Sequence, residues 1–329
     1  MIQKERRAFG LSALYTPNLL IKTLDRLLGF SHINDFVERP EIASLETLPF
    51  LDHVNDHFGL VSRFDPSLDS IVGKSGAKII VCNHPTGLAE TITLCREILK
   101  IRSDLKVVAN AMLGSIKPLA PILLLTDVFK DGQQQANAQL LKQALKHLQS
   151  DGLLLLFPAG EISHLHSHGI IDGPWSYTPL WLAKMSGASL VCIHADSENH
   201  SSFYQLRKIN QHISTAFIGK ALYAQRGKPV CYKCSSAISF SRLPNLTKNE
   251  ASEYLRSLTY SMQTSYQPAK AFSIHSENLA ISPETALLEQ ELGRLEPLLQ
   301  HKQFTLYETK SAPVPNLMLH LGIEREKAF

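Results

Sequence analysis

Residues 79–94 read Ile-Ile-Val-Cys-Asn-His-Pro-Thr-Gly-Leu-Ala-Glu-Thr-Ile-Thr-Leu, and this stretch decides the fold. Its uncharged apolar start predicts a buried strand, which Pro85 ends because proline can neither pair in a strand ladder nor continue a helix. His84 and Glu90 are six residues apart, so their side chains can meet only if His84 lies in a turn and Glu90 in the first turn of the next helix. The sequence therefore predicts a histidine and a carboxylate at the end of a buried strand.

Such a pair can act as a general base. The carboxylate holds the proton on one ring nitrogen, which leaves the other nitrogen free to take a proton from a hydroxyl. From this stretch alone, a capping histidine in a tight turn beside a solvated glutamate remains an equal alternative.

A second stretch ends in the same way. Residues 153–163 read Leu-Leu-Leu-Leu-Phe-Pro-Ala-Gly-Glu-Ile-Ser, so an apolar strand is followed by Pro158, by Gly160 and then by a carboxylate and a hydroxyl. Glycine lets the backbone approach a ligand closely. Because ligands of open α/β sheets bind at the carboxyl ends of strands, we expect the two strand ends to line one crevice.

Together these stretches resemble the glycerolipid acyltransferase family, which contains the lysophosphatidate acyltransferases. Its histidine–carboxylate motif resembles Asn83-His84-Pro85 with Glu90, and its Phe-Pro-x-Gly motif resembles residues 157–161 with Ser163. The closer resemblance is to the branch of the ornithine-lipid O-acyltransferases and the proteins labelled as hemolysins, whose acid also lies six positions after the histidine. It covers roughly residues 20 to 245.

The resemblance implies an α/β fold with a mixed sheet flanked by helices. It also implies an O-acyltransferase in which His84 takes the proton of a lyso-lipid hydroxyl, Glu90 orients the imidazole, and the hydroxyl attacks an acyl thioester. The expected acceptor is a lyso-ornithine or related amino-lipid. The alternatives are a lysophosphatidate or lysophospholipid acyltransferase and a lipid-binding relative without catalysis. No metal and no cofactor are implied, and the co-substrate is a thioester of acyl carrier protein or coenzyme A.

The resemblance also indicates substrate contacts. Backbone N–H groups around Gly160 would hold the oxyanion or the polar head of the acceptor. The full set of expected substrate-binding residues is Asn83, Gly87, Lys117, Pro158, Gly160, Glu161 and Ser163. Two positions depart from the family: Glu90 stands where most members have aspartate, and Cys192 stands where proline is common.

Hydrophobic periodicity divides the chain into four parts. These are N-terminal helices packing on or anchoring the core (1–75), an α/β core (76–265), a linker (266–282) and a C-terminal segment (283–329). Amphipathic helices are expected over 16–29 and 47–59. Strands are expected near 78–82, 105–109, 122–126, 153–157, 188–194 and 229–240, and helices near 89–100, 134–149, 175–186, 200–212 and 249–264.

The C-terminal segment predicts a helix over 284–300 and a strand over 303–308. Residues 291–307 are similar to the start of an N-acyltransferase-like module that some bacterial amino-lipid synthases carry, so we expect the chain to stop before that module's acyl-donor fold. A helical extension packed on the core is the alternative.

Charge indicates the partners. The net charge is only +3, yet no acid lies between Asn199 and Asn249, where eight lysines and arginines occur. A positive face is expected to attract an anionic membrane surface and an acidic acyl carrier protein, or simply to be solvated. Nucleic acid is not expected, because no nucleic-acid-binding module is recognisable.

Location and metal binding follow from composition. No apolar run reaches eighteen residues and no secretion signal is recognisable, so no transmembrane helix is expected. Five cysteines, an odd number, favour a reducing compartment. We therefore expect a peripheral protein on the cytoplasmic face of the inner membrane.

Two groups of residues could be considered as metal ligands, Cys231 with Cys234 and the histidines of 164–168. We expect the cysteines to lie on a strand and the histidines in a polar loop, without a metal.

Overall fold

The computed structural model describes residues 30–126, 134–166, 169–209, 218–243, 246–263, 285–301, 304–307, 309 and 314–328. The chain divides into two compact units, Met1–Tyr266 and Gln267–Phe329. The expected helix over 16–29 and the expected linker over 266–282 lie outside the described residues.

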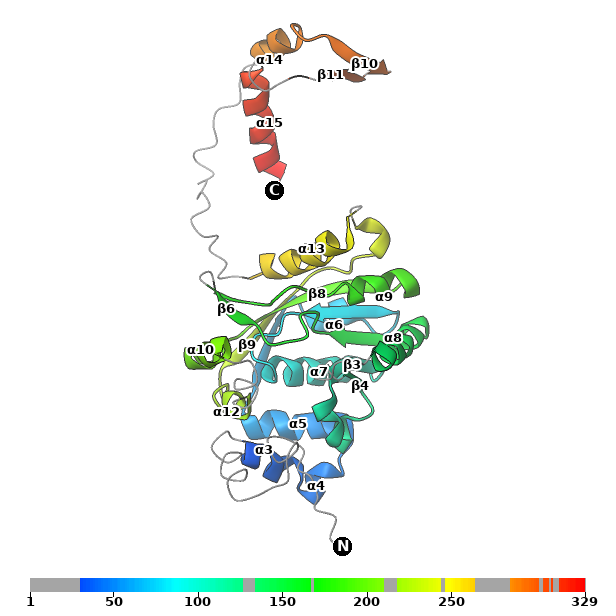
Figure 1. Cartoon of the computed structure of the whole chain (residues 1–329), viewed down its shortest axis with the longest axis vertical. Coiled ribbons are helices and arrows are strands. Elements are labelled where there is room, and N and C mark those ends of the chain that lie inside the picture. The colour runs from blue at the N-terminus through cyan, green and yellow to red at the C-terminus, as the bar shows by residue number, and fades with distance from the viewer. Residues whose placement is uncertain are drawn as a thin grey trace. The chain divides into compact units, whose positions relative to one another are not determined.

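The first unit is built on a seven-stranded mixed sheet in the order β1-β9-β8-β2-β5-β3-β4 (Figure 1). Neighbouring strands are parallel except for β8 and β9, which are antiparallel. The strands are β1 (Val61–Asp65), β2 (Lys78–Cys82), β3 (Leu105–Asn110), β4 (Leu123–Thr126), β5 (Leu153–Leu156), β8 (Ser189–Asp196) and β9 (Pro229–Cys234).

The central strands are apolar throughout because both of their faces are covered. On β2, Ile80 and Cys82 pack into the core on one face, while Ile79 and Val81 pack into the core on the other. Such continuous apolar runs are typical of parallel strands buried between two helix layers. The expectation of a mixed sheet flanked by helices is confirmed.

Helices cover both faces of the sheet. Figure 1 shows α5 and α7 on one side and α9 and α13 on the other. The helices of this unit are α3 (Phe30–Val37), α4 (Pro40–Ala43), α5 (Thr47–Phe58), α6 (Leu68–Val72), α7 (Ala89–Ile101), α8 (Gln134–Gln149), α9 (Thr178–Ser186), α10 (Ser201–Ile209), α12 (Ile218–Tyr223) and α13 (Lys248–Ser261). Short 3-10 helices are η1 (Ala111–Ser115), η2 (Lys117–Leu119) and η3 (Phe240–Arg242).

Most predicted elements of the core are present, with two corrections. β9 ends at Cys234, whereas a strand to residue 240 was expected; beyond it only a single bridge joins Ile238 to Leu190. The expected polar loop at His164 is instead a hairpin of β6 (His164–His166) and β7 (Gly169–Ile171). Strand pairing satisfies the backbone there, and a polar sequence does not exclude it.

The second unit contains α14 (Thr285–Leu292), an antiparallel pair of β10 (Pro297–His301) and β11 (Phe304–Tyr307), and α15 (Pro315–Ala328). The expected helix over 284–300 was wrong after Leu292, because Gly293 and Pro297 interrupt it and the chain continues as a strand. None of the described helices is both long enough and apolar enough to cross a bilayer.

Candidate active site

The site lies where three strands end. β2 pairs in parallel with both β5 and β8, so the segments that follow their last residues lie at one edge of the sheet. These segments carry the His84 motif, the Phe-Pro-Ala-Gly motif and residues 196–199. The sequence predicted that two strand ends would line one crevice, and in the structure the ends of three strands meet there.

His84 and Glu90 meet as the sequence predicted. Nδ1 of His84 lies 3.0 Å from Oε1 of Glu90, and Glu90 is fully buried in the first turn of α7. The contact is close but bent, since no acceptor is aligned with the proton of Nδ1. Hydrogen bonds of catalytic groups commonly tighten only when substrate binds. Nε2 makes no hydrogen bond to any described residue, which leaves it free to accept a proton.

Glu90 is held as an anion by its neighbours. Oε1 accepts the N–H groups of Thr86 at 3.1 Å and of Gly87 at 2.8 Å, and Oε2 accepts the Thr86 hydroxyl. Burial acts to raise the pKa of Glu90. The hydrogen bond and the charge of His84 act against it, as do the hydrogen bonds from Thr86 and Gly87, and the pKa of Glu90 lies below its ordinary value as a result. The carboxylate is thus available to orient the imidazole and to stabilise its charge.

The backbone before His84 is tied to the neighbouring strand. The Asn83 amide accepts the N–H of Ala195 at 2.7 Å and donates to the carbonyl of the same residue at 3.0 Å. Asn83 is buried, and this two-way bond fixes the end of β2 against the end of β8. The structure therefore places Asn83 in the scaffold of the loop.

The backbone after His84 is held by two later side chains. The Tyr204 hydroxyl donates to the carbonyl of Pro85 at 2.8 Å, and the Asn199 amide donates to the carbonyl of Thr86 at 3.1 Å. Both side chains are buried. Because the carbonyls of Pro85 and Thr86 have partners from outside the motif, the imidazole is carried on a fixed backbone.

Asp172 joins the two motifs, and sequence reasoning missed it. Its Oδ1 accepts the backbone N–H of His84 at 3.1 Å and the hydroxyl of Ser163 at 2.5 Å, and its Oδ2 accepts Nε1 of Trp175 at 2.9 Å. Asp172 is 1% exposed, and burial raises its pKa despite these bonds. No local pattern marks it, because its link to the His84 motif spans 88 residues of the chain.

In the second motif, the polar groups of Ser163 and Gly160 are already hydrogen-bonded within the protein. Ser163 is fully buried, its hydroxyl is used by Asp172 and its N–H donates to the carbonyl of His84 at 2.9 Å. Gly160 donates its N–H to Phe157 within the turn at 2.9 Å. Pro158 is buried, whereas Glu161 is partly exposed and pairs with Nε2 of His164 at 3.0 Å.

Phe157 connects the two motifs through its ring, whose centroid lies 4.2 Å from that of His84.

Gly87 adopts φ +93°, and a Cβ there would come within 2.7 Å of Ile162. Lys117 lies apart from the motif, exposed on η2 next to Ile116. The structure therefore brings Gly87 and Ser163 to His84 and leaves Lys117 and Glu161 on the surface.

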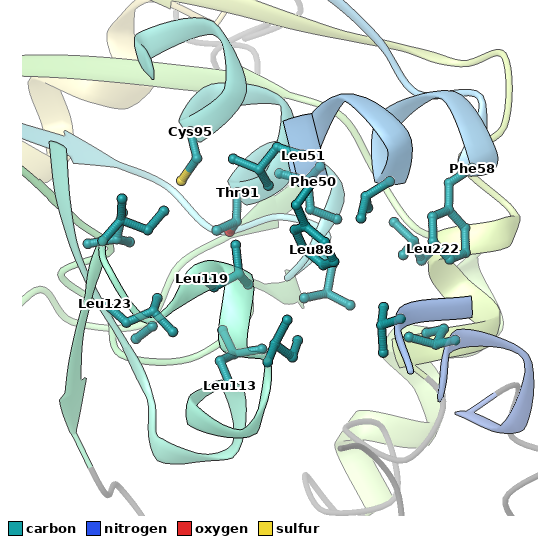
Figure 2. A pocket seen from close by; sticks show the side chains of 18 residues that line it. Phe50, Leu51, Phe58, Leu88, Thr91, Cys95, Leu113, Leu119, Leu123 and Leu222 are labelled. Atoms are coloured by element: carbon teal, nitrogen blue, oxygen red, sulfur yellow. The ribbon is translucent and has the colours of Figure 1, made fainter. Parts of the chain in front are cut away.

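An apolar cavity is lined in part by the residues that follow the His84 turn. It has a volume of about 70 Å³ and is enclosed by the start of α7, α3, α5, β3 and the segment 113–123. Figure 2 shows Leu88 and Thr91 of the motif region facing Leu113 and Leu119 across it. Leu88 and Thr91 are close neighbours of Glu90 in the chain, so the segment that carries Glu90 also contributes to the wall of this cavity.

A polar cavity of about 370 Å³ lies on the other side of the turn. It is lined by Asn83 and Pro85, by residues 194–198 at the end of β8, by Gly169 and Ile170, and by Gln263. Asn83 and Pro85 are the chain neighbours of His84. The turn that carries the base thus stands between an apolar and a polar cavity.

Among the residues that the structure describes, no three histidine, cysteine, aspartate or glutamate side chains are grouped so that they could hold a metal ion. Cys231 and Cys234 lie on β9, three residues apart and therefore on opposite faces of the strand. The part of the expected histidine cluster at 167–168 lies outside the described residues.

A family model described as acyltransferase matches residues 44–269, which include both motifs and Asp172. The chain belongs to this acyltransferase family, and it is an enzyme that transfers acyl groups.

The chain is similar to two acyltransferases that are named for their acceptor and to a solved acyltransferase structure. The chain is 23% identical over 262 residues to a lyso-glycine lipid O-acyltransferase of Bacteroides thetaiotaomicron, covering 75% of this chain and 91% of that protein. It is 23% identical to a lyso-glycine lipid O-acyltransferase of Phocaeicola vulgatus, covering 64% of this chain and 72% of that protein. The crystal structure of the 1-acyl-sn-glycerophosphate acyltransferase PlsC from Thermotoga maritima is similar with a TM-score of 0.42 and 13% identity, covering 77% of this chain and 97% of that one.

Proposed function

We propose that this enzyme is a lipid O-acyltransferase that moves a fatty acyl group from a thioester to the hydroxyl of a lyso-amino-lipid. The observation that carries the proposal is the His84–Glu90 pair, whose turn contributes Asn83 and Pro85 to a polar cavity and is followed by Leu88 of an apolar cavity. The names of two relatives, lyso-glycine lipid O-acyltransferases, support an amino-acid lipid as acceptor. A lyso-ornithine lipid belongs to the same chemical class.

The chemistry follows from the pair. Nε2 of His84 takes the proton of the acceptor hydroxyl while its oxygen attacks the carbonyl carbon of the thioester. The carbon–sulfur bond breaks, and the imidazolium returns the proton to the leaving thiolate. Glu90 stabilises the imidazolium between the two steps. No acyl-enzyme is needed, since the hydroxyl attacks directly.

The apolar cavity suits an acyl chain. All of its exposed wall is apolar, and it starts at Leu88, two residues before Glu90. Burial of each methylene contributes roughly 0.8 kcal/mol, so even a few carbons next to the thioester would be held in place. A chain seated there would present its carbonyl to His84.

The exposed basic side chains support a proposal for the partners and the location of the enzyme. Five exposed basic side chains, Lys220, Arg226, Lys228, Arg242 and Lys248, belong to the acid-free segment. Each would contribute roughly 1 kcal/mol near an anionic surface. We infer peripheral binding to the cytoplasmic face of the inner membrane, with acyl carrier protein as the favoured thioester carrier and coenzyme A as the alternative.

The test is mass spectrometry of lipid products. Purified protein is mixed with acyl-carrier-protein thioester and lyso-lipids with glycine, ornithine or glycerol-phosphate heads, beside His84→Ala. A diacylated product formed by the wild type and reduced about a thousandfold or more in the variant supports the mechanism. Equal turnover by His84→Ala would overturn it. Acylation of the glycerol-phosphate acceptor alone would replace the amino-lipid proposal with a lysophosphatidate one.

A further inference from the structure

The polar cavity beside His84 contains hydrogen-bond acceptors that the reaction itself does not use. Asp196 and Glu198 line it at and just after the end of β8, together with His194. Along a strand, side chains two residues apart share a face, so His194 and Asp196 point to the same side of the sheet. These residues lie next to Ala195, whose backbone is bonded to Asn83 in the motif.

His194 is buried without a polar partner. It is 2% exposed, and its ring makes no hydrogen bond to any described residue, with Nδ1 wholly enclosed. The ring of Tyr260 packs against it with centroids 5.4 Å apart. Burial, followed by the nearby charge of Lys233, lowers the pKa of His194 to about 4, so at neutral pH the ring is uncharged and can accept a hydrogen bond. A buried polar group without a partner calls for an explanation, and a hydrogen-bond donor on a ligand would supply one.

The two carboxylates also lack a cation. Neither Asp196 nor Glu198 forms an ion pair within the described part of the chain. Lys233 stands opposite His194 across the β8–β9 pair, but it is not among the residues that line the cavity. The cavity thus combines two negative charges with an uncharged ring nitrogen, and all three can accept hydrogen bonds.

We propose that this cavity binds the free amino group of the acceptor's head, an alkylammonium that donates to Asp196, Glu198 and His194. The inference rests on the proposed function and narrows it to lyso-lipids whose head carries a positive charge. An ammonium has three donors and no acceptor, which matches a cavity of three acceptors. A phosphate head would meet two like charges there, and an uncharged head would leave both carboxylates without a cation.

Binding of a small soluble probe tests the cavity directly. Isothermal titration compares Nα-acetyl-ornithine with Nα-acetyl-norvaline, which has the same carbon chain without the amine. We expect the wild type to bind the ornithine probe about tenfold or more tightly, and the double variant Asp196→Asn/Glu198→Gln to lose that difference. Asp56→Asn, an exposed acid on α5, is the matched control and should retain it. Equal binding of both probes by the wild type would overturn the inference.

Transfer assays separate this inference from the proposed function. The assay compares two acceptors with the same hydroxyacyl chain, which is joined to ornithine in one and to norvaline in the other. Preference for the ornithine acceptor that falls in the double variant supports head-group recognition, and equal rates with both acceptors refute it while leaving acyl transfer intact. Transfer to neither acceptor refutes the proposed function, and the probe titration then still decides whether the cavity binds an amine.

Discussion

The backbone N–H of His84 donates to Oδ1 of Asp172 over 3.1 Å, although the two residues are 88 positions apart. The same oxygen accepts the hydroxyl of Ser163 at 2.5 Å. One buried carboxylate therefore fixes the loop of the base and the loop of the second motif at once. Asp172 does not touch the reacting atoms in this arrangement, so it is a positioning residue.

Replacing Asp172 with asparagine tests this role. All three partners of its carboxylate are donors, so the NH2 of Asp172→Asn must face at least one of them. We expect the free energy of unfolding to fall by about 1–3 kcal/mol and kcat to fall about tenfold or more, with little change in acceptor KM. Urea unfolding and steady-state kinetics measure both. A variant with reduced stability but full kcat would show that Asp172 only supports the fold.

Shortening the acid next to the base tests whether the pocket is built around glutamate. Oε1 of Glu90 lies within 3.1 Å of His84 Nδ1 and of two backbone N–H groups. The carboxylate of Glu90→Asp is about one carbon–carbon bond shorter and leaves these donors unpaired, so we expect kcat to fall about 10–100-fold. Glu97→Asp, a half-buried acid on the same helix, is the control. Preserved kcat in Glu90→Asp would mean that the turn can move to follow the acid.

Much of the fold could be predicted because the decisive signals were local. The apolar run at 79–82 and the leucine run at 153–156 indicated buried strands, and a stripe of leucines indicated the helix at 134–149. The short strand β1 was missed because Val61–Asp65 alternates with charged residues at the sheet edge. The hairpin of β6 and β7 was missed because its pairing depends on backbone geometry more than on side-chain polarity.

The contact between His84 and Glu90 could be predicted because both residues lie within one strand–turn–helix unit. The residues that hold this unit could not, since Asp172, Asn199 and Tyr204 reach it through tertiary contacts more than 80 residues away in the chain. The surface position of Glu161 and the buried position of Ser163 were likewise undetermined. Spacing alone does not say which side of a turn faces the protein interior.

Two glycines with left-handed backbones should respond differently to alanine. Gly87 has φ +93°, and its Cβ would contact Ile162 and Ile218 within 2.8 Å, whereas Gly160 has φ +68° and no heavy atom within 4 Å. We expect Gly87→Ala to lower the free energy of unfolding by about 2–4 kcal/mol and to disturb the N–H that binds Glu90. Gly160→Ala should cost about 1–2 kcal/mol from backbone strain alone. Thermal unfolding compares the two, and equal losses would contradict the steric argument.

Burial of His194 makes stability depend on pH. Its pKa is lowered from 6.5 to about 4 in the folded chain, so between these values the unfolded chain binds more protons and stability falls as pH decreases. From about pH 7 to about pH 5 this group alone should cost about 2 kcal/mol. His194→Gln should show a smaller loss over the same range, measured by urea unfolding at each pH. Identical pH slopes in the two proteins would mean that the ring is protonated as easily as in water.

The length of acyl chain that the enzyme accepts should depend on the apolar cavity. Ala109 lines it from β3, so Ala109→Leu fills part of a space of about 70 Å³ and removes room for the far end of a chain. We expect kcat/KM for a long-chain thioester to fall about tenfold relative to a short-chain one, because each excluded methylene forfeits its burial. Ala120→Leu, which adds the same group at an exposed position just after Leu119, should leave the ratio unchanged. If both variants keep the wild-type ratio, the acyl chain lies elsewhere, and a cavity that begins two residues before Glu90 would serve only the packing of α5 against α7.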